Sequence, residues 1–245
     1  EQPHKKLQIK NLTKIMEAIR KQFNELYFGT NGTGKTQNML TTALAYFDSP
    51  ANANKNFLCI MPDFSESKYD DIPEIRVSDL GGYFGIGKIM AAEIRKGDHK
   101  SKSIYTEIYE RYAEKQRRFN GLIINDDMGG MFGRRPEDIN RMTTRKRQMN
   151  LDLMWNFHGL TTDCPKNFFK SVSGITLHQT EDDYKDTVDK IAPNKRAMFI
   201  ETYFQVQAVT NGVMLDAKGN PTVDVNNAIY NKEKLLKPYF NLRVA

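Results

Sequence analysis

The sequence has few cysteines and no long apolar segment, and these two absences exclude several classes of protein. Its two cysteines, Cys59 and Cys164, are too few for a disulfide framework, and no cysteine–histidine pair has the spacing of a zinc site. The longest apolar runs reach about five residues, whereas a helix that spans a bilayer needs roughly 20. No apolar centre of a signal peptide is visible near the N-terminus. We therefore expect a reducing, intracellular setting and no transmembrane segment.

The composition also lacks any strong bias. Hydrophobic residues make up 39% of the 245 residues and charged residues 27%, values that exclude collagen-like, low-complexity and wholly disordered proteins. The length suits one α/β domain with additions, or at most two small domains. The 36 lysines and arginines exceed the 30 acidic residues and give a net charge of +6. This moderate excess permits a polyanionic partner without demanding one.

Short apolar segments alternate with amphipathic segments through most of the chain, and this alternation predicts an α/β fold. Apolar runs predict strands at 26–28, 56–61, 121–125, 151–157 and 174–179, with a further short strand at 74–77. Apolar residues at helical spacing predict helices at 10–22, 39–47, 86–95, 104–119 and 136–148. We therefore expect a mainly parallel sheet between helices.

The same pattern divides the chain into an N-terminal helix (1–23), an α/β core (24–200) and a C-terminal extension (201–245). Within the extension, loose alternation over 204–215 is followed by turn residues at 216–221 and renewed alternation at 222–225. These features predict a small C-terminal hairpin, packed on the core.

A glycine-rich segment follows the first core strand and matches the phosphate-loop pattern G-x-x-x-x-G-K-[ST] at every specified position. The segment consists of Gly29, Thr30, Asn31, Gly32, Thr33, Gly34, Lys35 and Thr36. Its glycines let successive backbone N–H groups turn toward a β-phosphate, and the following helix adds partial positive charge. Lys35 would reach the β- and γ-phosphates, and the Thr36 hydroxyl would hold Mg²⁺. The segment therefore predicts a site for a nucleoside triphosphate and Mg²⁺, and the resemblance given below implies ATP.

The strand expected at 121–125 ends in two adjacent acids, Asp126 and Asp127. A phosphate loop needs such a partner, with one carboxylate beside Thr36 for the Mg²⁺ water shell and another to position the attacking water. We assign Asp126 to the metal and Asp127 to the water. Asn125 stands where many such strands are still apolar, so a register shifted by one residue stays open.

With these two motifs and the segment TRKRQMNLDLMWNFHG at 144–159, the chain resembles the FtsK–HerA superfamily of DNA-pumping ATPases over residues 24–180. It is most similar to the compact genome-packaging ATPases of viruses, including membrane-containing phages, and to the Zot-type ATPases of filamentous phages. In that superfamily an arginine-bearing helix leads into a strand that ends in a polar sensor, usually glutamine. The resemblance implies a RecA-like P-loop NTPase core.

The resemblance also implies roles for residues of this segment. His158 occupies the sensor position, with Asn156 as the alternative. A neutral histidine can orient a water or a phosphate, and its titration would make that step sensitive to pH. Ring ATPases need an arginine from a neighbouring subunit to stabilise charge on the γ-phosphoryl group. Arg145 is the favoured finger, and Arg141 and Arg134 are the alternatives.

The function that the resemblance implies is an ATP-hydrolysing DNA translocase, foremost a viral motor that pumps DNA into a preformed capsid as a homo-oligomeric ring. Its partners would be DNA, contacted without sequence specificity, and a capsid or portal-vertex protein, in the virion or the host cytoplasm. Basic clusters at 96–102, 115–118 and 134–147 could contact phosphates. Two alternatives stay open: an assembly or extrusion ATPase of the filamentous-phage type, and a nucleotide-dependent switch or kinase that pumps no DNA.

Overall fold

The strands lie side by side in one sheet. The computed structural model describes residues 22–29, 33–61, 67–91, 103–127, 136–158, 168–178, 185–191, 193–210 and 242–244. Within these residues the strand order is β3-β2-β4-β5-β1-β6-β7; neighbours from β3 to β6 pair in parallel, and β7 is antiparallel to β6. The bounds are β1 (Asn24–Phe28), β2 (Asn56–Met61), β3 (Ile86–Met90), β4 (Gly121–Asn125), β5 (Leu151–Phe157), β6 (Gly174–Leu177) and β7 (Leu242–Val244).

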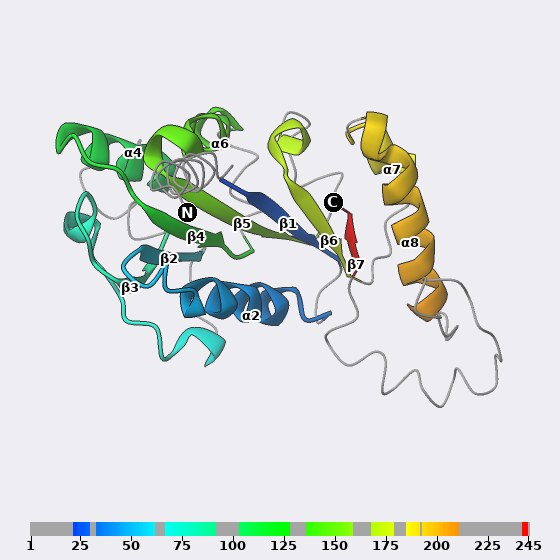
Figure 1. The fold of residues 1–245 in the computed structure, drawn as a ribbon, viewed down its shortest axis with the longest axis horizontal. Helices are drawn as coiled ribbons and strands as arrows, with labels where there is room; N and C mark the ends of the chain where they lie inside the picture. Colours follow the sequence, from blue (N-terminus) through cyan, green and yellow to red (C-terminus); the bar gives the residue numbers. More distant parts are fainter. Residues whose placement is uncertain are drawn as a thin grey trace, which may run out of the picture.

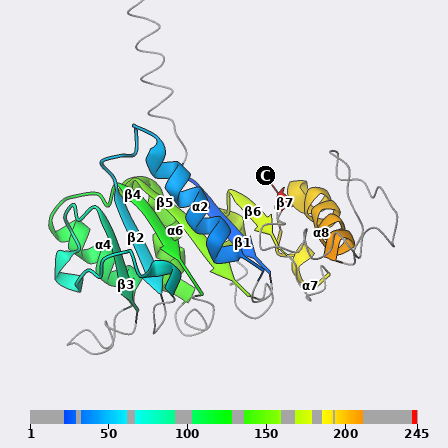
Figure 2. The same cartoon turned by 90° about the horizontal axis from the view of Figure 1, so that it is seen from below.

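Helices cover both faces of this sheet. Helix α2 lies on one face, α4 and α6 lie on the opposite face, and α7 and α8 lie beyond β6 and β7 (Figures 1 and 2). The helices are α2 (Lys35–Asp48), α4 (Ile104–Glu114), α6 (Pro136–Met149), α7 (Lys185–Val188) and α8 (Arg196–Thr210). Short 3₁₀ helices are η1 (Ser67–Tyr69), η2 (Val77–Asp79), η3 (Phe168–Ser171) and η4 (Pro193–Lys195).

Burial on both faces explains why the central strands are continuous apolar runs. In β2, Leu58 and Ile60 join the core beneath α4 and α6, whereas Phe57, Cys59 and Met61 join the core beneath α2. Each central strand therefore contributes to two cores, one on each side of the sheet, and its direction and register are strongly specified.

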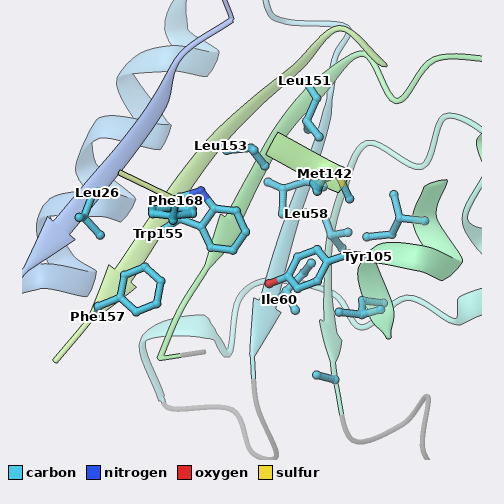
Figure 3. Close-up of a cluster of buried hydrophobic side chains, with 14 of the residues drawn as sticks. Leu26, Leu58, Ile60, Tyr105, Met142, Leu151, Leu153, Trp155, Phe157 and Phe168 are labelled. Carbon is cyan, nitrogen blue, oxygen red and sulfur yellow. The ribbon is translucent and has the colours of Figure 1, made fainter. Parts of the chain in front are cut away.

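The larger core centres on Trp155 of β5. Its ring lies 5.1 Å from that of Phe168 and 5.7 Å from that of Tyr105, measured between centroids, and Figure 3 shows these rings packed with Leu26 and Phe157. The indole N–H of Trp155 donates to Asn24 Oδ1 at 2.6 Å. This bond satisfies a buried polar group on β1, so it links β1 to β5 through side chains as well as backbone.

The structure confirms most of the elements expected from the sequence. The strands expected at 26–28, 56–61, 121–125, 151–157 and 174–179 are β1, β2, β4, β5 and β6, and the helices expected at 39–47, 104–119 and 136–148 are α2, α4 and α6. Helix α4 ends at Glu114, before its expected end, because Gln116 takes a left-handed conformation with φ 51°.

The prediction of a helix at 86–95 is wrong for residues 86–90, because Ile86–Met90 forms strand β3 in parallel register with β2. Residues 92–95 lie outside the described residues. Gly87 packs so closely against Ile75 that a Cβ there would lie 2.5 Å from Ile75 Cγ2. Pairing with β2 satisfies the backbone groups of this glycine-rich segment, whereas glycine weakens a helix. In the strand expected at 74–77, Glu74 makes one isolated bridge to Lys88, and Val77 begins η2.

The C-terminal extension differs from the expected hairpin at its start. Residues 204–210, expected to begin the first hairpin strand, belong to helix α8, and the rest of that hairpin lies outside the described residues. The chain nevertheless returns to the sheet, because β7 pairs with β6 at 242–244. The helix expected at 10–22 also lies outside the described residues, which begin at Gln22.

The close approach of β4 to β2 at Gly121 suggests a test of the fold. A Cβ on Gly121 would lie 2.0 Å from the backbone oxygen of Asn56, its partner on β2. We expect Gly121→Ala to lower the free energy of unfolding by about 2–3 kcal/mol, since two hydrogen-bonded backbones would have to move apart. Urea unfolding measures this loss. The matched control is Gly82→Ala, where the nearest atom would be 3.8 Å away; equal losses in both variants would contradict the strand pairing.

Candidate nucleotide-binding site

The carboxyl ends of β1, β4 and β5 meet at one edge of the sheet, because these parallel strands run in the same direction. From β1 the chain passes to α2 on one face, and from β4 it passes to α6 on the other (Figures 1 and 2). In α/β proteins whose connections reverse in this way, ligands bind outside the carboxyl ends of the strands. Residues of the phosphate-loop, acidic and sensor motifs all lie at this edge.

The loop after β1 leads directly into α2, whose first residue is Lys35. Gly34 precedes it with φ 81° and ψ 17°, a left-handed conformation that only glycine adopts at little cost. Glycine has no side chain that could cap the helix, and the N-terminus of a helix attracts anions. Gly29 and Thr33 flank the middle of the loop, and its residues Thr30, Asn31 and Gly32 lie outside the described residues.

Thr36 and Asp126 contact each other at the centre of the site. The Thr36 hydroxyl donates to Asp126 Oδ1 at 2.9 Å. The Asn156 amide donates to Thr36 Oγ1 at 3.0 Å and also to Asp126 Oδ1. From the other side, the Tyr69 hydroxyl donates to Asp126 Oδ2 at 2.5 Å. All four residues are buried, so their mutual hydrogen bonds hold the carboxylate in one place.

This cluster offers oxygen atoms that fit Mg²⁺. The Thr36 and Asp126 oxygens lie 2.9 Å apart, which matches neighbouring ligands of an octahedral ion at about 2.0–2.1 Å. The buried carbonyl oxygen of Asn156 accepts no hydrogen bond from any described residue. Among the described residues, no group of three or more carboxylate, histidine or cysteine side chains is arranged to hold a metal ion by itself. Thr36 and Asp126 would therefore share the ion with water and ligand oxygens, as is usual where Mg²⁺ accompanies phosphates.

A second chain of contacts joins Lys35 to Asp127 through His158. Lys35 Nζ lies 3.2 Å from His158 Nδ1, and His158 Nε2 lies 2.5 Å from Asp127 Oδ1. The ammonium group can only donate and the carboxylate can only accept. Both contacts are satisfied by the neutral imidazole that carries its hydrogen on Nε2. The sequence-predicted residues Lys35 and Asp127 thus both contact His158, the third predicted residue.

The charges of this chain influence one another. Burial lowers the pKa of Lys35 to about 8, against the opposing effect of the Asp126 and Asp127 carboxylates, while Lys68 lowers it further. The hydrogen bond from His158 lowers the pKa of Asp127 below its usual range; burial opposes this effect, and the positive charges of Lys35 and Lys68 reinforce it. At neutral pH the site therefore presents an ammonium group beside two carboxyl groups, of which Asp127 is firmly ionised.

The structure also shows how the acids at the end of β4 are oriented. Asn125 turns toward α4, where its Oδ1 accepts from the Tyr105 hydroxyl at 2.7 Å. Asp126 points to the α2 face and contacts Thr36. Asp127 takes a left-handed conformation with φ 49°, so the chain turns and its carboxylate reaches His158 instead. Of the two acids, Asp126 is therefore the one that lies beside Thr36.

The predicted arginine finger is not brought into this cluster. Arg145 lies on α6, with its guanidinium carbon 4.7 Å from the ring centroid of Tyr109 on α4 and a hydrogen bond to the Tyr109 hydroxyl. Helices α4 and α6 cover the face opposite to α2 (Figure 1). Arg141 is also exposed on α6, and Arg134 lies outside the described residues.

Sequence reasoning missed three residues of the site: Tyr69, Lys68 and His178. Tyr69 and Lys68 belong to η1, in a segment without periodicity or motif, so no signal in the sequence indicated them. His178 follows β6, and its Nδ1 lies 2.8 Å from the backbone oxygen of Thr33 in the phosphate loop. Its place after a strand of the parallel sheet could have indicated it, because the carboxyl ends of such strands share one edge.

Comparison with known proteins adds evidence on the fold. No protein-family model and no curated protein matches the chain. Among solved structures, the genome packaging NTPase B204 from Sulfolobus turreted icosahedral virus 2, in complex with AMPPCP, is similar at a TM-score of 0.54 and 12% identity, over 74% of this chain and 86% of that chain. The chain has the fold of a P-loop NTPase.

A further B204 structure, described as the DNA-packaging ATPase from Sulfolobus Turreted Icosahedral Virus, matches 90% of this chain and 91% of its own at a TM-score of 0.50 and 13% identity. The complex of B204 with AMP reaches a TM-score of 0.54 at 12% identity, over 72% and 86% of the two chains. At such identities the likeness concerns the fold. The resemblance to viral packaging ATPases inferred from the sequence is thereby confirmed for the architecture.

The lowered pKa of Lys35 predicts that this residue destabilises the nucleotide-free protein. Below pH 8 Lys35 is protonated in both the folded and the unfolded chain, so the full cost of holding the buried charge is present; the cost disappears as the pH rises toward 10.5, the ordinary value for lysine. We expect Lys35→Met to raise the free energy of unfolding at pH 7 by an amount on the order of 2 kcal/mol, and by much less at pH 10.

Urea unfolding at the two pH values measures this gain. Lys115→Met is the matched control, because Lys115 is exposed just after α4 and its replacement should give no comparable gain at pH 7. A Lys35→Met variant that is less stable than the wild type at pH 7 would contradict the burial of an unfavourable charge.

Proposed function

We propose that this protein binds ATP with Mg²⁺ and hydrolyses it, and that hydrolysis drives the movement of DNA. The observation that carries the proposal is the meeting of Lys35, Thr36, Asp126, Asp127 and His158 at one edge of a parallel sheet. A phosphate loop, a metal-binding hydroxyl and carboxylate, and a second carboxylate for water are the parts that NTP hydrolysis requires. The fold shared with a genome packaging NTPase that binds ATP analogues supports the same conclusion.

The contacts suggest a role for each residue. The loop of Gly29–Thr36 would wrap the phosphates, and Lys35 would exchange His158 for a phosphate oxygen, since its ammonium group is already at this edge. Thr36 and Asp126 would hold Mg²⁺, which supplies positive charge to the β- and γ-phosphates when bound. Asp127 would orient the attacking water by accepting its hydrogen bond. His158 would hold Asp127 through its Nε2–H, as it does here at 2.5 Å.

Asn156 is the other residue suited to a sensor role. Its amide contacts both Thr36 and Asp126, and its carbonyl oxygen is buried without a described partner. It therefore responds to any change at the metal site, whereas His158 lies between Lys35 and Asp127 and responds to the phosphates and the water. We propose that both residues act in sensing and that His158, the outer of the two, faces the γ-phosphate.

The DNA part of the proposal is supported by a basic hollow on another edge of the sheet. Arg117, Arg118 and Tyr83 line a hollow of about 390 Å³ together with Asn56 and Asn120, which lie next to the amino ends of β2 and β4. Both arginines and Tyr83 are exposed. Arginines contact phosphates without reading sequence, and an exposed aromatic ring can stack on a base. The residue types that line the hollow therefore support the proposal of a nucleic-acid contact here.

The most specific form of the proposal is a viral genome-packaging motor. In this form the chain acts as a homo-oligomeric ring that pumps DNA into a preformed capsid, bound to a capsid or portal-vertex protein, in the virion or the host cytoplasm. Residues 24–200 would form the ATPase core, flanked by an N-terminal helix (1–23) and a C-terminal extension (201–245). No helix among the described residues is long and apolar enough to cross a membrane.

ATP turnover in the presence of DNA tests the proposal. We expect turnover to rise on adding DNA and to rise further, per molecule, with protein concentration, because ring assembly completes the site. Lys35→Ala should abolish turnover, since it removes the mobile cation of the phosphate loop. Arg117→Ala combined with Arg118→Ala should reduce the stimulation by DNA and weaken its dependence on salt. Double-stranded DNA, single-stranded DNA and RNA at equal nucleotide concentration identify the cargo.

The outcomes separate the competing functions. ATP turnover that no nucleic acid changes would contradict DNA pumping and favour a slow nucleotide-dependent switch, while phosphate transfer to a small acceptor would favour a kinase. Stimulation by a phage coat or membrane protein, and not by DNA, would favour the filamentous-phage assembly ATPase. No turnover by the wild-type chain under any of these conditions would contradict the ATPase proposal itself.

Arg145 is proposed as the finger that one subunit donates to the ATP site of its neighbour. Its guanidinium group is exposed on α6 and held over the Tyr109 ring, on the face of its own sheet opposite to α2. An arginine placed in this way contributes to another subunit's site more readily than to its own. The proposed role of Arg145 therefore depends on the proposed homo-oligomeric ring, in which one subunit reaches the ATP site of the next.

A mixing experiment tests this finger. We expect Arg145→Ala to bind ATP almost normally and to lose DNA-stimulated turnover by a factor on the order of 10³. Mixed with Lys35→Ala subunits, it should regain part of the activity, because an intact Arg145 then meets an intact phosphate loop at some interfaces. Arg141→Ala is the matched control on the same helix. Rescue of Arg141→Ala alone would move the finger to that residue, and no rescue in either mixture would contradict action between subunits.

A further inference from the structure

His178 joins the phosphate loop to the strand next to it. It follows β6, the neighbour of β1 on the side away from β5, and its side chain is completely buried. Its Nδ1 lies 2.8 Å from the backbone oxygen of Thr33, and its Nε2 lies 3.3 Å from Nδ2 of Asn38 on α2. The imidazole therefore contacts both the loop and the helix that the loop begins.

These two partners determine the protonation of the ring. A carbonyl oxygen only accepts and the Asn38 N–H₂ group only donates, so the ring carries one hydrogen, on Nδ1, and its Nε2 is a lone-pair acceptor. Burial, aided by the charge of Lys35, lowers the pKa of His178 to about 4, although the Thr33 carbonyl opposes the shift. The imidazole is neutral at physiological pH, and the direction of each hydrogen bond is fixed.

The bond to Thr33 orients a whole peptide group. The peptide unit is planar and trans, so the carbonyl of Thr33 and the N–H of Gly34 point in opposite directions. His178 draws the carbonyl toward β6. The N–H of Gly34 therefore points away from the His178 ring.

Gly34 makes such a constraint necessary. Its left-handed conformation (φ 81°) is required for the turn into α2, but a residue without a Cβ reaches many other conformations at little cost. Rotation of the Thr33–Gly34 peptide would exchange the positions of its carbonyl and N–H. The loop would then present an oxygen to a phosphate, which repels it. The same glycine that allows the turn thus leaves the peptide free to rotate unless something holds it.

We propose that His178 is a positioning residue that holds the Thr33–Gly34 peptide in the orientation for binding a β-phosphate. The hydrogen bond from Nδ1 to the Thr33 carbonyl holds the peptide group, and the hydrogen bond from Asn38 holds the imidazole ring in place. The inference rests on the nucleotide-binding part of the proposed function and is independent of DNA. It means that this peptide group is oriented for a phosphate before any nucleotide arrives, so binding spends less free energy on orienting it.

Two conservative replacements of His178 separate its two hydrogen bonds. The amide nitrogen of asparagine can take the place of Nδ1, whereas the longer glutamine places its amide near Nε2. We expect His178→Asn to bind ADP within about threefold of the wild type, and His178→Gln to bind it roughly tenfold more weakly, the effect of one lost orienting hydrogen bond. Calorimetric titration with ADP gives the dissociation constants, and thermal unfolding without nucleotide gives the stability of each variant.

The comparison of the two variants distinguishes positioning from general support. Equal ADP affinity in His178→Gln and wild type would overturn the proposal, as would losses in both variants that simply follow their thermal stabilities. The matched control is Asn38→Ala, which leaves the Thr33 bond in place and should weaken ADP binding less than His178→Gln does.

A measurement on the unmodified chain covers the case in which both variants fail to fold. With ¹⁵N-labelled histidine, the Nδ1–H of His178 should give a slowly exchanging NMR signal in the nucleotide-free protein and keep it on adding ADP. A signal that is present only with ADP would contradict a preformed loop. A wild type that binds no ADP, as we expect of Lys35→Ala, would contradict the nucleotide-binding proposal. A wild type that binds ADP, together with a His178→Gln variant of equal affinity, would contradict the inference about His178 and leave the nucleotide-binding proposal in place.

Discussion

The position of β5 between β1 and β4 is the constraint on which the candidate site depends. Neighbouring strands are about 4.8 Å apart, so the strand before the phosphate loop and the strand before the acids are separated by a full strand. Asn156 and His158, at the end of β5, fill that separation: one contacts Thr36 and Asp126, the other Lys35 and Asp127. Thr36 and Asp126 also contact each other directly, but only the residues at the end of β5 join Lys35 to Asp127 in the contacts described above.

The nucleotide-free site is a closed network of hydrogen bonds. Its lysine, hydroxyl and two carboxylates all have partners within the protein. Binding of a charged ligand at such a site exchanges one set of partners for another, so little order has to be created when the ligand arrives. The free-energy cost falls instead on the stability of the folded chain. Burial of Lys35, which lowers its pKa to about 8, is unfavourable, and so is the left-handed conformation of Asp127 at φ 49°.

The sequence predicted the central fold because its signals were local and strong. Continuous apolar runs marked β2, β4 and β5, and the spacing of the phosphate loop fixed Lys35 and Thr36 within their elements. Strand β3 was missed because it lies at the edge of the sheet and contains glycine, so its pairing with β2 and not its own pattern decides its conformation. Tyr69 and His178 contact the site from segments far away in sequence, and only the assembled sheet brings them there.

The strand order has a consequence for how the chain folds. Strand β1 pairs only with β5 and β6 among the described strands, and its partner residues on β5 lie 129 positions further along the chain. Closing so long a loop delays the pairing, because its entropy must be lost before the contacts form. During synthesis, the glycine-rich loop leaves the ribosome early but cannot take its final shape until β5 and β6 have emerged. Of the three motifs at the site, the phosphate loop is therefore synthesised first, and it becomes able to hold a ligand last.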